Sequence, residues 1–129
     1  MVSLAARPDP IEIILEQSAL VVVDMQNAFA SEGGMLDLAG HDISKAAAVV
    51  DVNKKLINEA RAAGVKIVYL QVGYKPDLSD AGGPLSPNHH KELSLRIMRE
   101  RPELDGKLLI HGTWDWDIVD ALKPEPGDL

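Results

Sequence analysis

Two short apolar runs, separated by a helical pattern, are the clearest features of the chain. Residues 19–23 (Ala-Leu-Val-Val-Val) are uninterrupted by polar side chains and rich in β-branching, which is typical of a strand covered on both faces. Residues 65–70 (Val-Lys-Ile-Val-Tyr-Leu) predict a second strand. Because a helix fits between the two runs, we expect a right-handed parallel crossover and an α/β fold.

The intervening segment predicts one amphipathic helix. Asp42 or Ser44 is expected to cap its start, and Gly64 is expected to end it. Its apolar positions are spaced three or four residues apart, as on one face of a helix: Val49, Val52, Leu56, Ala60 and Ala63.

The second half of the chain contains a long loop and two expected helices. Residues 73–87 are rich in Gly, Pro, Asp and Ser, a composition typical of a functional or mobile loop. Helices are predicted over about residues 88–101 and 114–122, and both are followed by proline. Leu129 is expected to begin a third core strand, so residues 1–129 are interpreted as the N-terminal portion of a single larger domain.

Composition narrows the classes of function. Twenty acidic against 13 basic residues give a net charge of −7, which disfavours nucleic acid and anionic membranes as partners. The absence of cysteine excludes disulfides, thiolate metal sites and thiol catalysis by this chain alone. No apolar run approaches the roughly 18–20 residues of a spanning helix, and no export signal is evident, so we expect a cytoplasmic location.

Candidate chemistry lies where the two predicted strands end. In open parallel sheets, ligands bind at the carboxyl ends of the strands, and Asp24 and residues 72–74 lie there. In a pocket made partly of Met25, Phe29 and Tyr74, a partly desolvated Asp24 would suit proton transfer. The alternative, equally compatible with the spacing, is that Asp24 only satisfies backbone donors in the next turn.

The stretch Asp24-Met-Gln-Asn-Ala-Phe29, following its apolar run, resembles the first motif of isochorismatase-like cysteine hydrolases. The similarity runs from about Arg7 to Leu129 and looks most like the ureidoacrylate amidohydrolase branch. It continues through the segments 33–40 (Gly-Gly-Met-Leu-Asp-Leu-Ala-Gly), 81–84 (Ala-Gly-Gly-Pro), 86–88 (Ser-Pro-Asn), 106–109 (Gly-Lys-Leu-Leu), 112–115 (Gly-Thr-Trp-Asp) and 126–128 (Pro-Gly-Asp).

The resemblance implies a three-layer, Rossmann-like parallel-sheet fold, of which this chain is the N-terminal portion. It also implies an Asp/Lys/Cys triad that hydrolyses a C–N bond of a small ureido compound in pyrimidine degradation. Only the aspartate maps onto this sequence, at Asp24, so the chain alone is expected to be inactive without the C-terminal segment. A homo-oligomer without a cofactor is expected.

Four further residues are expected to contact the substrate: Phe29, Val72, Tyr74 and Asp80. Tyr74 could equally be plain packing, and Asp80 could be a solvated surface charge. Val72 stands where the ureidoacrylate branch is expected to carry a polar side chain, which leaves the identity of the substrate open.

No metal is expected. Nicotinamidase relatives carry an Asp-x-His pair after the second strand, where this chain has Gln71-Val-Gly-Tyr74. His89 and His90 are adjacent and point in different directions on a helix, which disfavours a shared metal ion.

Three other functions are considered besides ureidoacrylate hydrolysis. One is a biuret or triuret hydrolase of the same family, and another is a non-catalytic interaction domain that docks a partner on its sheet edge. A nucleotide-binding domain is disfavoured, because Asp24-Met-Gln-Asn27 replaces the glycines that let backbone approach a phosphate.

Overall fold

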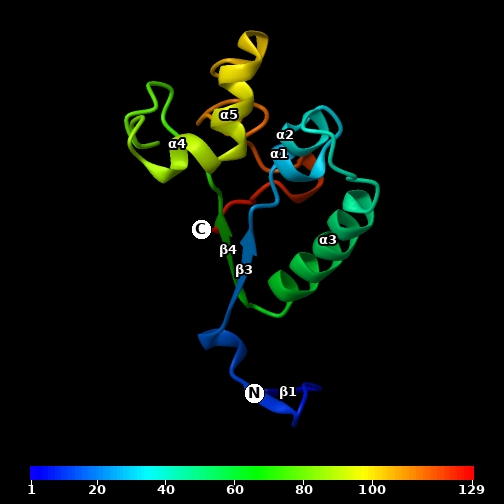
Figure 1. Cartoon of the computed structure of the whole chain (residues 1–129). Helices are drawn as coiled ribbons and strands as arrows, with labels where there is room; N and C mark the ends of the chain where they lie inside the picture. Colours follow the sequence, from blue (N-terminus) through cyan, green and yellow to red (C-terminus); the bar gives the residue numbers. More distant parts are fainter.

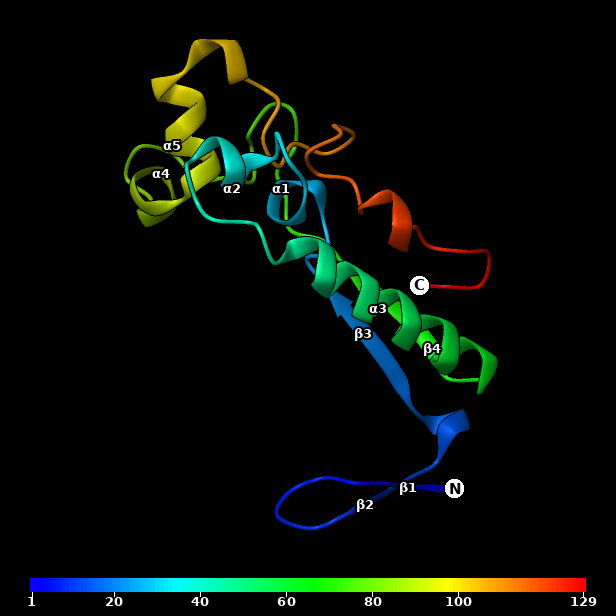
Figure 2. The ribbon, with the colours of Figure 1, turned by 90° about the vertical axis from the view of Figure 1, so that its right-hand side faces the viewer.

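A computed structural model describes residues 1–129 and has a two-stranded parallel sheet at its centre. Strands β3 (Ala19–Val23) and β4 (Lys66–Leu70) pair in register from Ala19↔Lys66 to Val23↔Leu70. Helix α3 (Ala46–Ala62) connects them and lies along one face of the pair (Figures 1 and 2). The two predicted strands, their parallel pairing with a helix between them, and the α/β class are confirmed.

Helix α3 ends where the sequence predicts, but it presents a different face to the sheet. Gly64 adopts φ +77°, and the N–H of Val65 bonds back to the Ala60 carbonyl at 2.9 Å. The side chain that α3 buries is Ile57, at 3% exposure, in a cluster with Val22, Ile67, Ile118, Val119 and Leu122. The predicted apolar face is wrong for four of its five positions: Val49, Val52 and Leu56 are 50%, 63% and 51% exposed, and Ala63 is exposed as well.

The start of α3 also differs from the prediction. Lys45 occupies the N-cap position, and no side chain accepts a hydrogen bond there. Asp42 instead accepts from the N–H of Ser44 at 2.9 Å, two residues along. Its carboxylate therefore stabilises the turn before the helix and not the helix itself.

An antiparallel hairpin precedes the sheet. Strands β1 (Val2–Leu4) and β2 (Ile11–Ile13) pair with each other, and a short 3₁₀ helix, η1 (Leu15–Gln17), leads into β3. Figure 2 shows this hairpin standing apart from the rest of the molecule, beyond the amino end of β3. The hairpin is absent from the sequence-based prediction because each strand has only three residues, too few to give a periodic pattern.

Short helices gather beyond the carboxyl ends of β3 and β4. They are α1 (Asn27–Ala30), α2 (Met35–Leu38), α4 (Pro87–Lys91), α5 (Leu93–Glu100) and the 3₁₀ turn η2 (Pro102–Leu104). The helix predicted over residues 88–101 is split, because Glu92 has extended dihedral angles (φ −70°, ψ 121°). Ser86 caps α4 by accepting from the N–H of Asn88.

The helix predicted over residues 114–122 is wrong except for its last turn, the 3₁₀ helix η3 (Asp120–Leu122). The backbone of this segment bonds to residues far away in sequence. The carbonyls of Asp115 and Asp117 accept from the N–H groups of Ala28 and Asn27 at 2.8 and 2.9 Å. These long-range bonds replace the i→i−4 bonds that a helix would make.

One face of the sheet is apolar and uncovered. Val21, Val23 and Leu70 are 48%, 54% and 50% exposed, although strands of this composition are typically covered on both faces. On the outer edge of β4, Leu129 donates to the Ile67 carbonyl and accepts from the N–H of Tyr69, at 3.0 and 2.7 Å. Both bonds follow the pattern of a parallel ladder.

None of the helices combines the length and hydropathy needed to cross a bilayer.

Candidate functional site

The candidate site lies at the carboxyl edge of the sheet. Because β3 and β4 are parallel, Asp24 and Gln71 emerge side by side at the ends of their strands. Figure 1 shows both strands pointing toward the short helices α1, α2, α4 and α5. This edge is where open parallel sheets bind ligands.

Asp24 has a strained backbone conformation, and its carboxylate makes no hydrogen bond or ion pair within the chain. Its φ is +55°, a left-handed conformation that costs a non-glycine residue roughly 1–2 kcal/mol. Its N–H donates to the Leu70 carbonyl at 2.9 Å, which continues the β3–β4 pairing by one bond. The residue is half-buried.

No donor within the chain bonds to the Asp24 carboxylate, in contrast to several other aspartates. Asp37, Asp42 and Asp77 each accept from a nearby backbone N–H at 2.7–3.0 Å. Asp24 therefore does not have the turn-forming role that the sequence left open for it. Backbone strain around a free carboxylate is typical of a functional residue.

Gln26 joins the ends of the two strands. It is fully buried, and its amide bonds to both backbone polar atoms of Val72, accepting from the N–H and donating to the carbonyl, each at 2.9 Å. It also donates to the Trp116 carbonyl at 2.6 Å. The sequence offers Gln26 as part of a motif, but its contact with Val72 spans 46 residues and is visible only in the fold.

Of the two expected substrate contacts after β4, Val72 is linked to the turn that carries Asp24, and Asp80 is not. Val72 is 38% exposed and is tied through Gln26 to the turn that follows Asp24. Asp80 is exposed in the loop after β4, and its carboxylate accepts from the N–H of Lys75 at 2.9 Å. The structure thus brings Val72 to the strand ends, while one oxygen of Asp80 closes its own loop.

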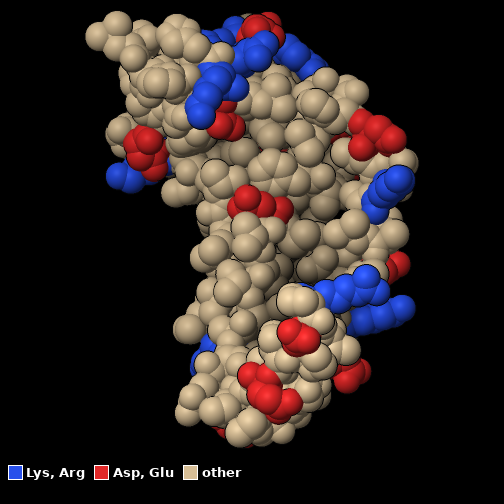
Figure 3. All heavy atoms as spheres, turned by 60° about the horizontal axis from the view of Figure 1, so that its bottom comes forward, with Lys and Arg blue, Asp and Glu red and all other residues tan.

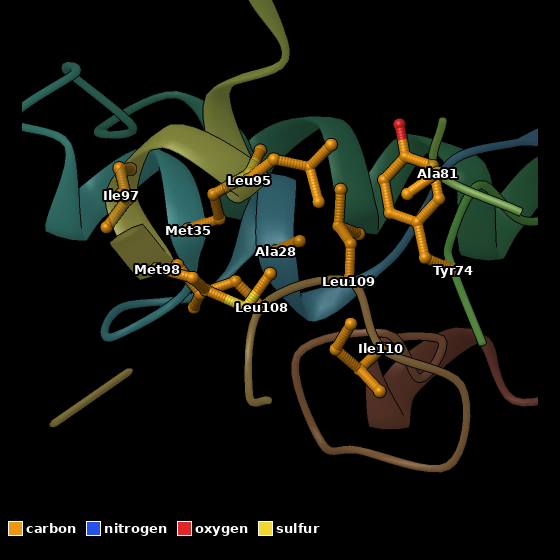
Figure 4. Close-up of a cluster of buried hydrophobic side chains, with 10 residues drawn as sticks. All are labelled: Ala28, Met35, Tyr74, Ala81, Leu95, Ile97, Met98, Leu108, Leu109 and Ile110. Carbon is orange, nitrogen blue, oxygen red and sulfur yellow. The ribbon is translucent and has the colours of Figure 1, made fainter. Parts of the chain in front are cut away.

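Phe29 and Tyr74 are both associated with one apolar cluster, and Figure 4 shows Tyr74 among its ten buried members. Phe29 is half-buried on α1 and packs against this cluster, while Tyr74 is a member of it at 8% exposure. The Tyr74 hydroxyl accepts a long hydrogen bond, 3.5 Å, from the side-chain amide of Asn88. Burial raises the pKa of Tyr74, and the nearby carboxylates of Glu92 and Asp80 raise it further.

Met25 packs against a different apolar cluster from the expected pocket partners. Its side chain lies against the cluster of Val22, Ile57 and Ile67 beneath α3. Phe29 and Tyr74 lie in the other cluster, so Met25 shares a core with the sheet and α3 rather than with them.

Asp115 is a buried charge that the sequence did not single out from its Trp-Asp-Trp-Asp surroundings. Its carboxylate accepts from the N–H of Met35 at 2.9 Å and from the N–H of Leu109 at 2.8 Å. Burial raises the pKa of Asp115, and the bonds from Leu109 and Met35 oppose that shift. Asp115 holds together the loops that carry the short helices.

A cavity of about 360 Å³ is lined by residues of the 78–82 loop, α4, α5 and η2, and by Asp105. Its lining includes the apolar side chains of Leu95 and Met98 and the polar side chains of His89 and Arg99. The Arg99 guanidinium already donates to the His89 carbonyl. Asp24, Phe29, Val72, Tyr74 and Asp80 are all outside its lining.

No three His, Cys, Asp or Glu side chains gather in a geometry that could hold a metal ion. The rings of His89 and His90 meet edge to face with centroids 5.0 Å apart. On the face shown in Figure 3, acidic and basic side chains are interspersed among uncharged ones, without a continuous basic surface.

Comparison with known proteins gives a consistent result. The model of the isochorismatase domain matches residues 18–129. The ureidoacrylate amidohydrolase RutB of Rhizobium rhizogenes is 54% identical over 128 residues, which cover 99% of this chain and 52% of the relative. The protein of the same name from Cronobacter turicensis is 55% identical, with 99% and 55% covered. The chain spans about half the length of the curated relatives it matches.

Two crystal structures show the same fold. A cysteine hydrolase from Pseudomonas syringae pv. phaseolicola superposes with a TM-score of 0.64 at 30% identity, covering 91% of this chain and 46% of that protein. An isochorismatase family protein from Desulfovibrio vulgaris gives 0.62 at 27% identity, covering 88% and 50%. The resemblance drawn from the sequence motifs is confirmed, and the chain belongs to the isochorismatase domain family.

Proposed function

We propose that this chain supplies the proton acceptor of an amidohydrolase that cleaves a C–N bond of a small ureido compound. The observation that carries the proposal is Asp24, a half-buried carboxylate with no structural partner, held in a strained conformation at the carboxyl edge of the sheet. Relatives more than 50% identical are named ureidoacrylate amidohydrolases, which supports ureidoacrylate as the substrate.

In the proposed mechanism, Asp24 accepts the proton of a cysteine thiol that lies outside this chain. The thiolate forms a C–S bond with the ureido carbonyl carbon, and backbone N–H groups stabilise the oxyanion. The C–N bond then breaks as the departing nitrogen takes the proton from Asp24. Water cleaves the C–S bond and restores the thiol, with Asp24 again relaying the proton.

The remaining site residues are proposed substrate contacts. Val72 stands next to the Asp24 turn, and Phe29 and Tyr74 come from the apolar cluster beyond the strand ends. Asp80 would accept an N–H of the ureido group through the oxygen that does not bond to Lys75. A lysine beside Asp24 and the cysteine, also outside this chain, would hold the two in position.

The uncovered sheet face supports a further polypeptide segment carrying the cysteine and the lysine. Val21, Val23 and Leu70 offer it an apolar surface, and the two backbone bonds of Leu129 to β4 support the addition of another strand at this edge. The exposed residues Val49, Val52 and Leu56 on α3 form a second apolar surface, which supports a homo-oligomer.

The same uncovered face also favours the second candidate, a non-catalytic domain that docks a partner there. One experiment separates the two. Leu129 is joined to the part of the Rhizobium rhizogenes relative beyond the matched region, which gives a chimeric polypeptide of full family length. The chimera is assayed for ammonia and carbamate release from ureidoacrylate, biuret and triuret, with the relative's segment alone as control.

Turnover of ureidoacrylate by the chimera, but not by either half alone, is the expected result. Preference for biuret or triuret would assign the alternative substrate, for which the apolar Val72 is the structural reason. A folded chimera that hydrolyses none of the three would favour the docking domain.

A further inference from the structure

The pairing of β3 with β4 ends before the candidate site begins. The last paired residues are Val23 and Leu70, and one further bond joins the Asp24 N–H to the Leu70 carbonyl. At φ +55°, Asp24 turns the chain away from the strand direction. The ladder therefore cannot continue through backbone groups alone.

The side chain of Gln26 takes over where the ladder stops. Its amide oxygen accepts from the Val72 N–H and its amide nitrogen donates to the Val72 carbonyl, both at 2.9 Å. A neighbouring strand offers the same pair of groups, one acceptor and one donor. The second amide hydrogen bonds to the Trp116 carbonyl at 2.6 Å, so both donors of the buried amide are used.

Gln26 thereby fixes the separation between the turn that carries Asp24 and the segment that carries Val72. Neither residue is held at this edge by a side-chain bond of its own. Gln71 adds a parallel tie, because its amide donates to the same Trp116 carbonyl at 3.0 Å. Three chain segments, after β3, after β4 and around Trp116, meet at these two glutamine side chains.

We infer that Gln26 is a positioning residue: it holds the Asp24 turn at a set distance from the Val72 wall against which the substrate rests. The inference rests on the proposed function. Because a misplacement of about 1 Å can cost on the order of 10²-fold in rate, loss of this tie lowers turnover even if the fold survives.

Asn27 provides a matched control in the next position. It is also buried, at 4% exposure, and its side chain makes two bonds: it donates to the Trp114 carbonyl at 2.8 Å and accepts from the Ser31 hydroxyl at 2.7 Å. Neither bond reaches β4 or Val72. Asn27→Asp thus removes a buried donor bond, the one to Trp114, without releasing the Asp24–Val72 spacing.

The test compares Gln26→Glu with Asn27→Asp in the chimera joined at Leu129. The glutamate keeps the shape and the acceptor for the Val72 N–H but removes both donors; Gln26→Met serves in its place if the glutamate variant does not fold. We expect kcat to fall about 10- to 100-fold for the Gln26 variant, with KM changed less than about threefold. Asn27→Asp is expected to keep kcat within about threefold at a similar loss of thermal stability.

Amide hydrogen exchange at Val72 gives a readout that does not depend on activity. Exchange is expected to accelerate at least tenfold in Gln26→Met, which removes the acceptor of the Val72 N–H, and to stay unchanged in Asn27→Asp. Equal losses of kcat in the two variants, or unchanged exchange at Val72, would overturn the positioning role. An inactive wild-type chimera that still shows the Val72 exchange difference would refute the proposed function while leaving the Gln26–Val72 tie established.

Discussion

The carboxylate of Asp115 accepts a hydrogen bond from the backbone N–H of Leu109 at 2.8 Å, inside the protein. A second bond, from the N–H of Met35, reaches its other oxygen at 2.9 Å. One buried side chain thus connects α2 with the segment that carries Leu108, Leu109 and Ile110, the centre of the apolar cluster in Figure 4.

Asp115→Asn is expected to lower the free energy of unfolding by about 1–3 kcal/mol, because an asparagine has one acceptor oxygen and leaves one buried N–H unpaired. Urea unfolding of the chain measures the loss. Asp105→Asn is the control, since Asp105 is exposed. Equal stability of the two variants would show that the Asp115 carboxylate does not hold these loops.

The ion pair between Arg61 and Asp128 gives a pH dependence of defined sign. Burial alone would raise the pKa of Asp128, but the Arg61 guanidinium, 2.6 Å away, and the N–H of Glu125 bring it below its ordinary value. A lowered pKa means that the pair stabilises the fold above about pH 4 and that this stability is lost as the pH falls through the folded pKa.

Asp128→Asn should therefore destabilise the chain at pH 7 and have a smaller effect at pH 3. The pH dependence contributed by Asp115 has the opposite sign. Its pKa is raised, so it favours the fold at low pH, and that contribution is lost as the pH rises past about 4. The free energy of unfolding in urea, measured for Asp128→Asn and for the wild type at pH 7 and pH 3, isolates the contribution of Asp128. If Asp128→Asn lowered the free energy of unfolding equally at pH 7 and pH 3, the ion pair with Arg61 would not be the source of this pH dependence.

Gly73 is required by close packing. A Cβ at this position would collide with the Trp116 ring and lie 2.9 Å from the Leu109 carbonyl oxygen. Gly73→Ala is expected to cost about 1–3 kcal/mol of stability through overpacking. Gly83→Ala, where a Cβ meets no atom within 4 Å, is the matched control in thermal unfolding. A smaller loss for Gly73→Ala than for the control would show that Trp116 does not pack there.

Two adjacent residues of α3 test which face of the helix is the core. Ile57→Ala is expected to cost about 2–5 kcal/mol, because Ile57 is buried in one cluster with Val22 of β3 and Ile67 of β4. Leu56→Ala should change stability by less than about 0.5 kcal/mol, since Leu56 is 51% exposed. If urea unfolding showed a larger loss of stability for Leu56→Ala than for Ile57→Ala, the buried face of α3 would be the one that periodicity predicts.

The sequence predicts what local patterns determine. β3 and β4 are runs of apolar, β-branched residues, and Gly64 ends α3, so these elements follow from the chain itself. The face of α3 was mispredicted because periodicity alone cannot distinguish an exposed apolar stripe, such as Val49 and Val52, from a buried one.

Long-range bonds explain the remaining differences. The segment after Trp114 is not helical because its carbonyls bond to Asn27 and Ala28, almost 90 residues earlier. In the site, the position of Asp24 at the strand end is predictable, because the apolar run of β3 stops directly before it. The tie between Gln26 and Val72 is not, because nothing in either sequence neighbourhood indicates the other.

The measurement that tests the central claim most directly is the turnover number of Asp24→Asn in the chimera joined at Leu129. Asparagine keeps the size of Asp24 and tolerates the left-handed conformation equally well, but it cannot accept the thiol proton. Asp51→Asn, an exposed change on α3, serves as the control. A fall in kcat of about 10²- to 10⁴-fold with unchanged thermal stability is predicted, and an Asp24→Asn chimera that turns over ureidoacrylate at the wild-type rate would contradict the account.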